Sequence, residues 1–250
     1  MFRIAHSEGS FIKNVFQAAL APLDTAPLYI RSEFLEIRGL SPDRLIMSIL
    51  TISSIMFEEY QLSRETSLLV DKEELLASFK RLSRRDKVVL SYEDGSRDLK
   101  VLLINTKTGA EREFAVQIKE ENIEPIGDIQ LDLEVEAQMS GDVFTTIVKD
   151  AAIVGDEVEF RVSGDTLRII SRGEDKEYQT TLTSDKGLLS LSSSLENVSS
   201  KYSIDLVKQV AKAVDPDSVV IIQYGPNKPL KLRLSLGGGA SLTYWITPRV

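Results

Sequence analysis

The residue types that most often perform enzyme chemistry are scarce in this sequence. It has no cysteine, which excludes disulfides and thiolate metal sites, and His6 is its only histidine, so a serine–histidine–aspartate arrangement would have to use it. No Walker-type phosphate loop is present, and the glycine run Gly237–Gly239 reads as a turn between strands. Carboxylates are numerous but scattered, and a nuclease-like metal cluster remains an open alternative. We expect no catalytic residue, no metal and no cofactor.

Basic side chains form the second group with chemical potential, because Lys and Arg contact phosphates. The net charge of the chain is −8, which argues against tight binding to naked DNA. A role on DNA would therefore depend on local patches. Lys208 and Lys212 lie four residues apart, away from the apolar positions of their segment. The full set of candidate cations is Lys13, Lys72, Lys80, Arg81, Arg84, Lys149, Lys208 and Lys212.

An internal repeat predicts two domains of one design. Leu99–Leu103 matches Leu230–Leu234 at an offset of 131, and Phe11–Leu20 resembles Phe144–Ile153 at an offset of 133. The length of 250 residues suits two domains of ordinary size. We predict an N-terminal domain at 1–118, a connecting loop at 119–130 and a C-terminal domain at 131–250.

Each half is expected to combine two helices with several strands, an α+β design. Apolar residues at helical spacing predict a helix over Phe11–Leu20 with Ser10 as its N-cap, and another over Ile204–Val214 that Asp215–Pro216 ends. Alternating patterns predict strands, and they fall at Phe2–Ala5, Leu28–Arg31, Phe34–Arg38, Arg44–Ile52, Leu131–Gln138, Val158–Val162 and Thr166–Ser171. The pairs Asp94–Gly95 and Gly225–Pro226 indicate turns.

The connecting loop is unusually apolar for a linker. It has no helical period and contains Pro125 and Gly127, yet Ile123, Ile126 and Ile129 recur among its acidic residues. We expect it to pack on the body of the protein or to present apolar side chains to a partner.

No part of the sequence indicates a membrane segment or a signal peptide. The start lacks an apolar run after basic residues, and the longest apolar stretch, Leu45–Met56, is too short to span a bilayer. We expect a cytoplasmic protein without membrane partners.

Several short motifs, in order and at matching spacing, resemble the proliferating cell nuclear antigen family of archaeal and eukaryotic DNA sliding clamps. The most specific is the closing segment Tyr244–Arg249, and Lys228–Lys231, Met139–Phe144 and Arg38–Arg44 also match. The resemblance covers essentially the whole chain. The end at Val250, without the acidic tail common in eukaryotic members, favours an archaeal protein.

The resemblance implies a non-enzymatic processivity factor. Three two-domain subunits would form a ring, with helices lining the hole and β-sheets outside. Such a ring would encircle double-stranded DNA in DNA replication and repair. It would bind DNA polymerase, a clamp loader, flap endonuclease and DNA ligase through short hydrophobic motifs. The candidate cations named above would face the DNA.

The resemblance also implies two protein-binding surfaces. A partner-peptide groove is expected from Leu40, Leu45, Met47, Ile126, Ile129, Pro229, Trp245 and Thr247. Asp128 departs from the usual family pattern, which leaves the shape of the pocket open. Subunit edges are expected at two alternating segments, with Phe114, Val116 and Ile118 on one and Lys176, Tyr178 and Thr180 on the other.

Two other classes of function stay open. The chain could be one subunit of a heterotrimeric clamp that acts only with paralogous chains. It could also be a β-rich oligomeric scaffold unrelated to DNA, a reading against which the basic residues on the helices argue. Failure to stimulate a polymerase would favour the scaffold.

Overall fold

The computed structural model describes residues 1–123 and 126–249, which separate into two compact units. Unit 1 comprises residues 1–42, 48–127 and 237–242, and unit 2 comprises residues 43–47, 128–236 and 243–250. Residues 43–47 of the first half of the chain therefore belong to unit 2, and residues 237–242 of the second half belong to unit 1. Of the connecting-loop residues named above, Pro125 lies outside the described residues.

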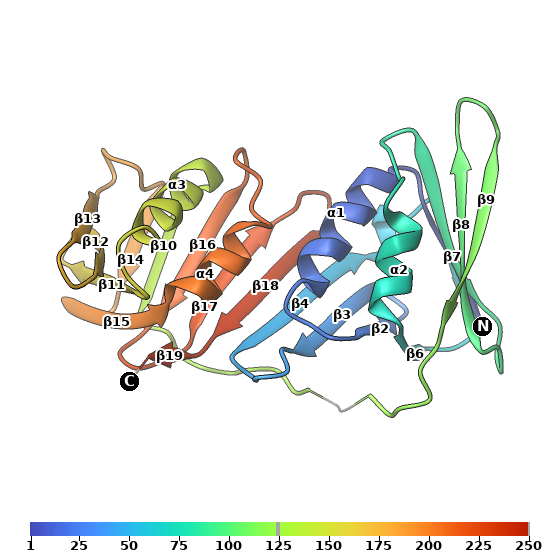
Figure 1. Cartoon of the computed structure of the whole chain (residues 1–250), viewed down its shortest axis with the longest axis horizontal. Coiled ribbons are helices and arrows are strands. Elements are labelled where there is room, and N and C mark those ends of the chain that lie inside the picture. The colour runs from blue at the N-terminus through green and yellow to red at the C-terminus, as the bar shows by residue number, and fades with distance from the viewer. Residues whose placement is uncertain (124–125, 250) are drawn as a thin grey trace. The chain divides into compact units, whose positions relative to one another are not determined.

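The first half of the chain follows the order strand, helix, five strands, helix, three strands (Figure 1). A short 3-10 helix, Ser54–Met56, interrupts the run of five. The elements are β1 (Phe2–His6), α1 (Gly9–Leu20), β2 (Ala26–Ile30), β3 (Phe34–Leu40), β4 (Ile46–Ser53), β5 (Glu59–Leu62), β6 (Thr66–Val70), α2 (Lys72–Phe79), β7 (Asp86–Tyr92), β8 (Asp98–Asn105) and β9 (Glu111–Gln117).

The second half repeats that order and adds one two-residue strand at its end. Its elements are β10 (Val135–Ser140), α3 (Gly141–Ala151), β11 (Glu157–Ser163), β12 (Thr166–Arg172), β13 (Glu177–Leu182), β14 (Ser190–Ser193), β15 (Asn197–Ser203), α4 (Ile204–Ala211), β16 (Val219–Tyr224), β17 (Leu230–Ser235), β18 (Ala240–Ile246) and β19 (Pro248–Arg249).

The strand pairing confirms the internal repeat. Strand β1 pairs with β5 and β7, as β10 pairs with β14 and β16. Strand β2 pairs with β3 and β6, as β11 pairs with β12 and β15. Strands β8 and β17 each follow their neighbours β7 and β16 as antiparallel hairpins. One topology thus occurs twice, and the predicted α+β class is confirmed.

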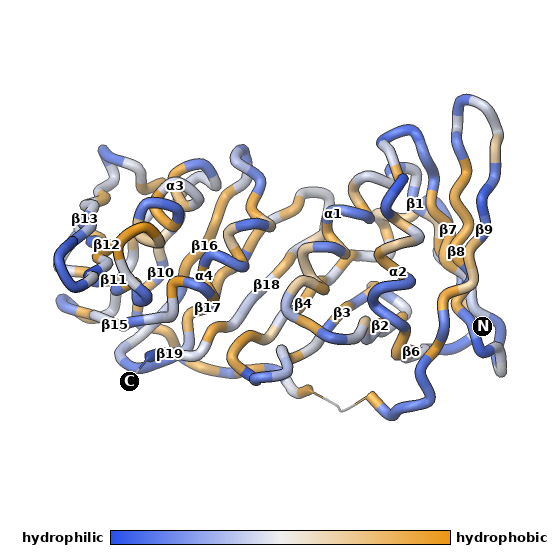
Figure 2. The backbone as a smooth tube through the Cα atoms, in the orientation of Figure 1, coloured by the Kyte–Doolittle hydropathy of each residue, from blue (hydrophilic) through white to orange (hydrophobic). Residues whose placement is uncertain are grey.

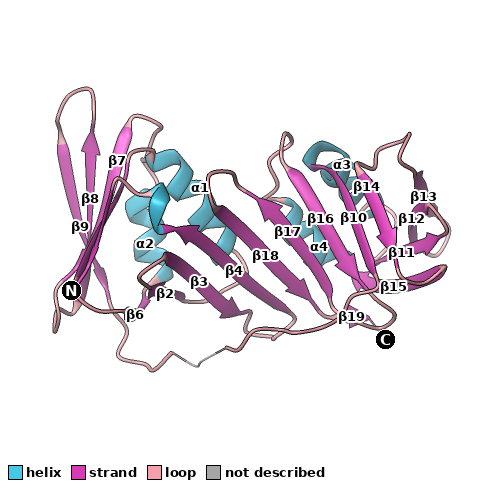
Figure 3. Ribbon diagram, turned by 180° about the vertical axis from the view of Figure 1, so that it is seen from behind, coloured by secondary structure: helices cyan, strands magenta, loops and turns pink. Residues whose placement is uncertain are grey.

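Helices lie on one face of the strands in each unit. Figure 3 shows, from behind, the opposite face, which is formed by strands. In unit 1, α1 buries Ile12, Val15 and Phe16 beneath it, and the ring of Phe16 meets that of Phe79 from α2 edge-on at 5.4 Å. In unit 2, the buried stripes are Phe144, Ile147 and Val148 on α3, and Ile204, Val207 and Val210 on α4. Apolar stripes at helical spacing account for this placement.

The helix ends differ from two sequence expectations. Helix α1 begins at Gly9 with Glu8 at the N-cap position, so Ser10 lies inside the helix and the predicted cap was wrong. Helix α4 ends at Ala211, although Val214 in the following turns is still buried. Side-chain caps occur elsewhere, because Asp71 accepts a hydrogen bond from Glu74 N and Ser140 accepts one from Val143 N.

Several predicted strand bounds also need correction. The strand predicted from Arg44 begins at Ile46, because Arg44 has φ +59°, a left-handed conformation that a strand does not tolerate. The strand predicted from Leu131 begins at Val135. Strands β5 and β6 were not predicted: β5 is short and only half-buried, so it lacks a clear apolar alternation. The turn at Gly237–Gly239 is confirmed, and all three glycines have positive φ.

Candidate functional sites

Most of the candidate cations are exposed side chains on or beside the helices. Lys80 and Arg81 follow the last residue of α2, where positive charge is favoured by the helix dipole, and Arg84 lies in the next turn. Lys149 is in the last turn of α3, Lys208 is in the last turn of α4, and Lys212 directly follows it. Figure 2 shows hydrophilic segments along both α3 and α4. These charges can therefore meet solvent or a polyanion.

Two of the cations are already engaged by backbone carbonyls. Lys13 Nζ donates to Lys80 O at 3.0 Å, and Lys72 Nζ donates to Leu23 O at 2.5 Å. Both side chains are half-buried. Exposed acids accompany the cations: Glu73 and Glu74 begin α2, and α3 and α4 carry their own, at Asp142, Asp150 and Asp205. The helical surfaces are thus only weakly basic.

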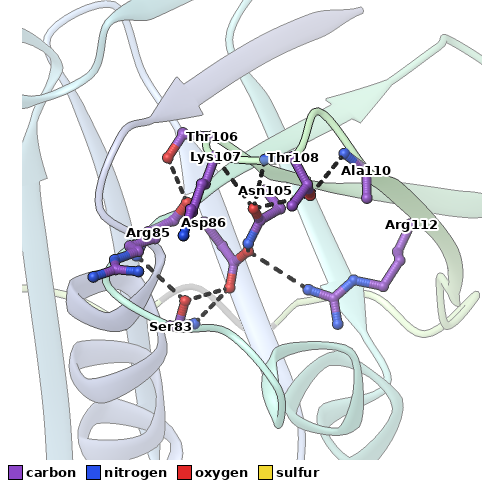
Figure 4. Close-up of polar contacts among 9 residues, drawn as sticks. All are labelled: Ser83, Arg85, Asp86, Asn105, Thr106, Lys107, Thr108, Ala110 and Arg112. Atoms are coloured by element: carbon purple, nitrogen blue, oxygen red, sulfur yellow. Dashed lines mark hydrogen bonds and ion pairs between the residues drawn. The ribbon is translucent and has the colours of Figure 1, made fainter.

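A buried carboxylate organises the segment that follows α2 (Figure 4). Asp86 is 2% exposed and accepts hydrogen bonds from Ser83 N at 2.8 Å, Ser83 Oγ at 2.7 Å and Asn105 Nδ2 at 3.0 Å. Arg112 Nη2 lies 3.7 Å from Asp86 Oδ1, the oxygen that also accepts from Asn105. Burial alone would raise the pKa of Asp86, but these hydrogen bonds and the Arg112 charge outweigh it and lower the pKa.

The connecting loop is anchored to unit 1 by an arginine of β3. Arg38 Nη1 donates to Ile126 O at 3.2 Å. The same guanidinium is held by Glu36, with Nε to Oε1 at 2.9 Å and Nη2 to Oε2 at 3.1 Å. Both side chains are largely buried, so this bidentate pair is shielded from solvent. Arg38 therefore fixes the backbone position of one predicted groove residue.

The predicted groove residues differ in exposure, unit by unit. In unit 1, Leu40 is 37% exposed and Ile126 is half-buried. In unit 2, Leu45 is 39% exposed and Thr247 N donates to Leu45 O at 3.0 Å. The remaining members are Ile129 and Pro229, which are half-buried, and Met47 and Trp245, which are 3% and 7% exposed. Lys231 Nζ lies 5.2 Å from the centre of the Trp245 ring.

In the described part of the chain, strand β9 ends its sheet beside β8, and at its last residue Gln117 O accepts from Asp71 N, just after β6. Ile118 N donates back to Arg97 O beside β8, whereas Gln117 N donates away from β8 to the Glu74 carboxylate at 2.8 Å. Because backbone direction alternates along a strand, Glu113 and Ala115 point away from β8 like Gln117. Of the predicted interface residues, Phe114 is 39% exposed, Val116 is buried and Ile118 is half-buried.

Strand β13 ends the corresponding sheet of unit 2, with β12 as its strand neighbour. Gly173 N donates to Lys176 O in the turn, so Lys176 faces β12 and, by alternation, Glu177, Gln179 and Thr181 face away. Tyr178 and Thr180 are half-buried, and Lys176 is an exposed residue just before the strand. Both predicted subunit edges are therefore edge strands with outward-facing backbone groups.

His6 has a packing role. Its Nδ1 accepts a hydrogen bond from Glu8 N at 3.0 Å, and its ring stacks on Phe11 at 5.1 Å and meets Phe57 edge-on at 5.8 Å. Burial lowers its pKa below the usual value. Among residues 1–123 and 126–249, no three His, Cys, Asp or Glu side chains converge to hold a metal ion. Within the same ranges, no helix is long and apolar enough to cross a membrane.

Sequence patterns did not reveal two of these contacts, Arg38 with Ile126 and Asp86 with Asn105. Arg38 was predicted as the last residue of a strand and the first of the motif Arg38–Arg44, but its bond to Ile126 joins residues 88 apart. Asp86 and Asn105 stood out neither by type nor by spacing. A charged residue opening the apolar strand β7 was the one available signal for Asp86, because buried carboxylates need partners.

Comparisons with known proteins agree with this architecture. Residues 1–125 match the family model described as "Proliferating cell nuclear antigen, N-terminal domain". The DNA polymerase sliding clamp of Thermofilum pendens is 26% identical over 239 residues, with 95% of each chain covered.

Solved structures resemble the whole chain. PCNA from Thermococcus kodakaraensis superposes with a TM-score of 0.92 at 24% identity, covering all of both chains. The PCNA2–PCNA3 complex of Sulfolobus tokodaii gives a TM-score of 0.87 at 25% identity and 99% coverage of each chain. A. fulgidus PCNA, solved with the C-terminal region of FEN-1, gives 0.84 at 25% identity, covering 100% of this chain and 99% of that one. The resemblance proposed from the motifs is confirmed, and the chain belongs to the proliferating cell nuclear antigen family.

Proposed function

We propose that the chain is a subunit of a DNA sliding clamp, a ring that encircles duplex DNA and tethers DNA polymerase and other replication and repair enzymes to it. Its domains would be 1–118 and 131–250, joined by the loop 119–130. The observation that carries the ring is the pair of edge strands β9 and β13, in which the backbone groups of residues such as Ala115 and Gln179 face away from the sheet. Such edges in soluble proteins are usually covered or paired.

The internal repeat indicates how these edges would pair. By position in the repeat, β9 corresponds to β18 and β13 to β4. Residues at or just beyond the ends of β4 and β18 are hydrogen-bonded within unit 1, by Ser53 N to Gly239 O, and within unit 2, by Thr247 N to Leu45 O. Strand β13 of one subunit next to β9 of another would repeat that arrangement. The contact is head-to-tail, so it makes a ring when the rotation closes.

Side chains at the two edges suit this pairing. Phe114 lies on the same face as buried Val101, and Tyr178 lies on the same face as buried Ser171. Joining the edges would cover the exposed parts of Phe114, Ile118, Tyr178 and Thr180, beside Val116, which is already buried. On the other face, Glu111 and Glu113 would approach the exposed cation Arg172, which lies opposite Glu177 in the strand register. Opposite charges there would favour this pair of edges over others.

Proline substitutions test the ring directly. Ala115→Pro and Gln179→Pro each remove an N–H that points away from the neighbouring strand, which leaves the fold intact but blocks one edge. Light scattering should give a three-subunit mass for the unaltered chain and smaller species for either variant. A mixture of both variants should stop at two subunits, because one productive pair of edges remains. A trimer from either variant alone would refute the edge assignment.

DNA would pass along the helices. Lys80, Arg81, Arg84 and the exposed lysines of α3 and α4 would make exchangeable phosphate contacts, and Lys13 and Lys72 would add to them after releasing their carbonyl partners. The nearby acids keep the attraction weak. Weak contact suits a ring that slides, because the closed ring, rather than affinity, retains the DNA.

Client enzymes would dock through short hydrophobic motifs at the predicted groove. The groove residues that are exposed or half-buried, and so could contact a peptide, are Leu40, Leu45, Ile126, Ile129, Pro229 and Thr247. Met47 and Trp245 are buried and would lie beneath them. Arg38 would keep Ile126 in place. The A. fulgidus relative that was solved with the C-terminal region of FEN-1 supports this mode of docking, and a clamp loader and DNA ligase would share the surface.

Peptide binding tests the groove. Replacing both Leu40 and Ile126 by Ala should abolish binding of a client peptide, measured by calorimetry, while the mass in solution stays unchanged. Arg38→Ala should weaken binding about tenfold, equal to about 1.4 kcal/mol, because the loop loses its anchor. Arg3→Ala is the matched control, since Arg3 also pairs with a glutamate, Glu59, on a strand of unit 1. Equal affinities for all four proteins would defeat the assignment.

A second candidate is a subunit of a heterotrimeric clamp. The PCNA2–PCNA3 complex among the similar structures favours it. The chain would then be a monomer when purified alone, across a range of concentrations, and would assemble after addition of paralogous chains. We further propose that the chain acts in the cytoplasm and is not itself a catalyst. Magnesium-dependent turnover of nucleic acid by the pure protein would contradict the second statement.

A further inference from the structure

The densest positive charge in the chain lies outside the helices, in the segment that connects α2 to β7. Residues 80–87 contain five of the 30 Lys and Arg residues, although the chain as a whole has a net charge of −8. Arg84 Nε lies 3.6 Å from a Glu8 oxygen, and Lys87 Nζ lies 2.5 Å from a Glu58 oxygen. Across residues 1–123 and 126–249, Lys80, Arg81 and Arg85 have no carboxylate within ion-pair distance, and all three are exposed.

A second turn is fastened beside this segment. Thr106 N and Thr106 Oγ1 both donate to Arg85 O, at 3.0 and 2.7 Å. The two bonds place the β8–β9 turn, with its exposed Lys107, directly against Arg85 (Figure 4). Arg85 and Lys107, 22 positions apart in sequence, therefore belong to one basic surface.

The Asp86 network fixes both turns at once. Its carboxylate accepts from Ser83 in the α2–β7 segment and from Asn105 at the start of the β8–β9 turn. Asn105 Oδ1 in turn accepts from Lys107 N, Thr108 N and Thr108 Oγ1. The Asp86 carboxylate contacts these neutral donors and Arg112, at 3.7 Å, and it forms no ion pair with Arg85 or Lys107, which are both described residues. The backbone at two cationic residues is thus held in place, and the network neutralises neither charge.

The segment is also packed from below. A Cβ on Gly9 would lie 2.7 Å from Asp86 O and 2.7 Å from Leu82 Cδ2, so the start of α1 supports the segment closely. Ser83 Oγ adds a bond by accepting from Arg85 N at 3.3 Å. Because the backbone that carries both cations is already ordered, only their side-chain rotamers remain to be fixed on binding an anion, which favours contact with a repeating polyanion.

We propose that Arg85 and Lys107 form a phosphate-binding site for the DNA backbone, and that Asp86 and Asn105 are its positioning residues. The site rests on the proposed DNA role and extends it from the helical cations to a turn between sheet strands. It has no base-reading groups to confer sequence preference, so its contacts would be non-specific.

The test is the salt dependence of binding to a short labelled duplex, followed by fluorescence anisotropy with the full chain. The double variant Arg85→Ala/Lys107→Ala should lower the slope of log affinity against log salt by about 2, near 0.9 for each lost phosphate contact. Arg97→Ala is the matched control, because Arg97 is an exposed cation in the β7–β8 turn, at the other end of strand β8. Its slope should equal that of the unaltered chain.

Asp86→Asn separates positioning from charge. The change removes a negative charge near the DNA, so electrostatics alone predicts tighter binding. Loss of positioning predicts the opposite, weaker binding with a slope lowered by about 1. Asn105→Ala keeps the Asp86 charge, releases the β8–β9 turn and should act in the same direction. It also serves if Asp86→Asn does not fold, and circular dichroism and solution mass verify the fold of each variant.

The outcomes distinguish this inference from the function on which it rests. An unchanged slope for the double variant would overturn the phosphate site. Tighter binding by Asp86→Asn and unchanged binding by Asn105→Ala would overturn the positioning role. If Lys149→Ala/Lys208→Ala lowers the slope in either case, the helical DNA surface stands and the failure is confined to the turns. If every variant leaves the slope unchanged, the DNA role fails with the site.

Discussion

Among the residues that the structure describes, each unit buries one carboxylate, and the two carboxylates have different partners. Asp86 in unit 1 accepts mainly from neutral donors, Ser83 and Asn105, and joins two turns. Glu159 in unit 2, 5% exposed, accepts from Ser199 Oγ at 2.5 Å, from Arg161 Nε at 2.9 Å and from Arg172 Nη1 at 3.3 Å.

The hydrogen-bond partners of each carboxylate decide whether the cations near it are neutralised. Glu159 is on β11, on the face away from buried Val158 and Phe160, and it neutralises charge there. Arg172 also pairs with Glu177 at 2.7 Å, which extends the network to the edge strand β13. Asp86 instead fixes the backbone of a segment whose cations stay exposed. A buried carboxylate with charged donors therefore neutralises nearby cations, whereas one with neutral donors leaves them free to bind other anions.

Deleting each carboxylate should give the largest difference between the two clusters. Asp86→Ala is expected to lower the free energy of unfolding by about 3 kcal/mol, because partly buried donors lose their acceptor and two turns separate. Glu159→Ala should cost about 1 kcal/mol, because Arg161 and Arg172, 45% and 51% exposed, can turn to water. Urea titration at one protomer concentration measures both. Equal losses would show that donor type does not matter.

Acid should weaken both clusters. The burial of each carboxyl raises its pKa, but hydrogen bonds and the arginine charges outweigh this, and both pKa values are lowered in the folded state. Below the ordinary values, about 3.9 for Asp and 4.3 for Glu, the unfolded chain binds more protons. Stability present above those values is therefore lost as the pH falls through the folded pKa values. The loss is smaller than for deletion, since a protonated carboxyl still accepts hydrogen bonds.

The acid effect can be assigned to its source. Asp86→Asn and Glu159→Gln should each flatten part of the stability curve between neutral pH and the acid limb, followed by urea titration at several pH values. If neither variant changes the curve, other carboxylates dominate the pH dependence of stability, and the charges of Asp86 and Glu159 do not account for it.

The smallest difference is expected at the serines. Ser83→Ala removes a donor to Asp86 and an acceptor for Arg85 N, and should cost about 1 kcal/mol. Ser199→Ala removes one donor to a glutamate that keeps two arginines, and should cost about 0.5 kcal/mol. Thermal melts of the two variants resolve the order. A larger loss for Ser199→Ala would reverse the ranking of the clusters.

Periodic features were predictable because one face of each element must be buried. The apolar positions Ile12, Val15 and Phe16 predicted helix α1, and alternating residues predicted β3, β11 and β12. The wrong predictions came from local backbone geometry. Arg44 adopts a left-handed conformation that its residue type does not predict, and Glu8 occupies the N-cap position that was predicted for Ser10. The exposed cations of the helices were likewise visible as residues off the apolar stripe.

The sequence by itself determined the repeated α+β design, the absence of thiol chemistry and the family, because hydrophobic period, composition and short motifs are local properties. Only the tertiary structure decided which polar groups meet: Arg38 with Ile126, Asp86 with Asn105, and Glu159 with Ser199. These contacts join residues distant in the chain, and their partners follow from strand pairing and turn packing. The unpaired edges of β9 and β13 emerged in the same way, since an edge is defined by the neighbour a strand lacks.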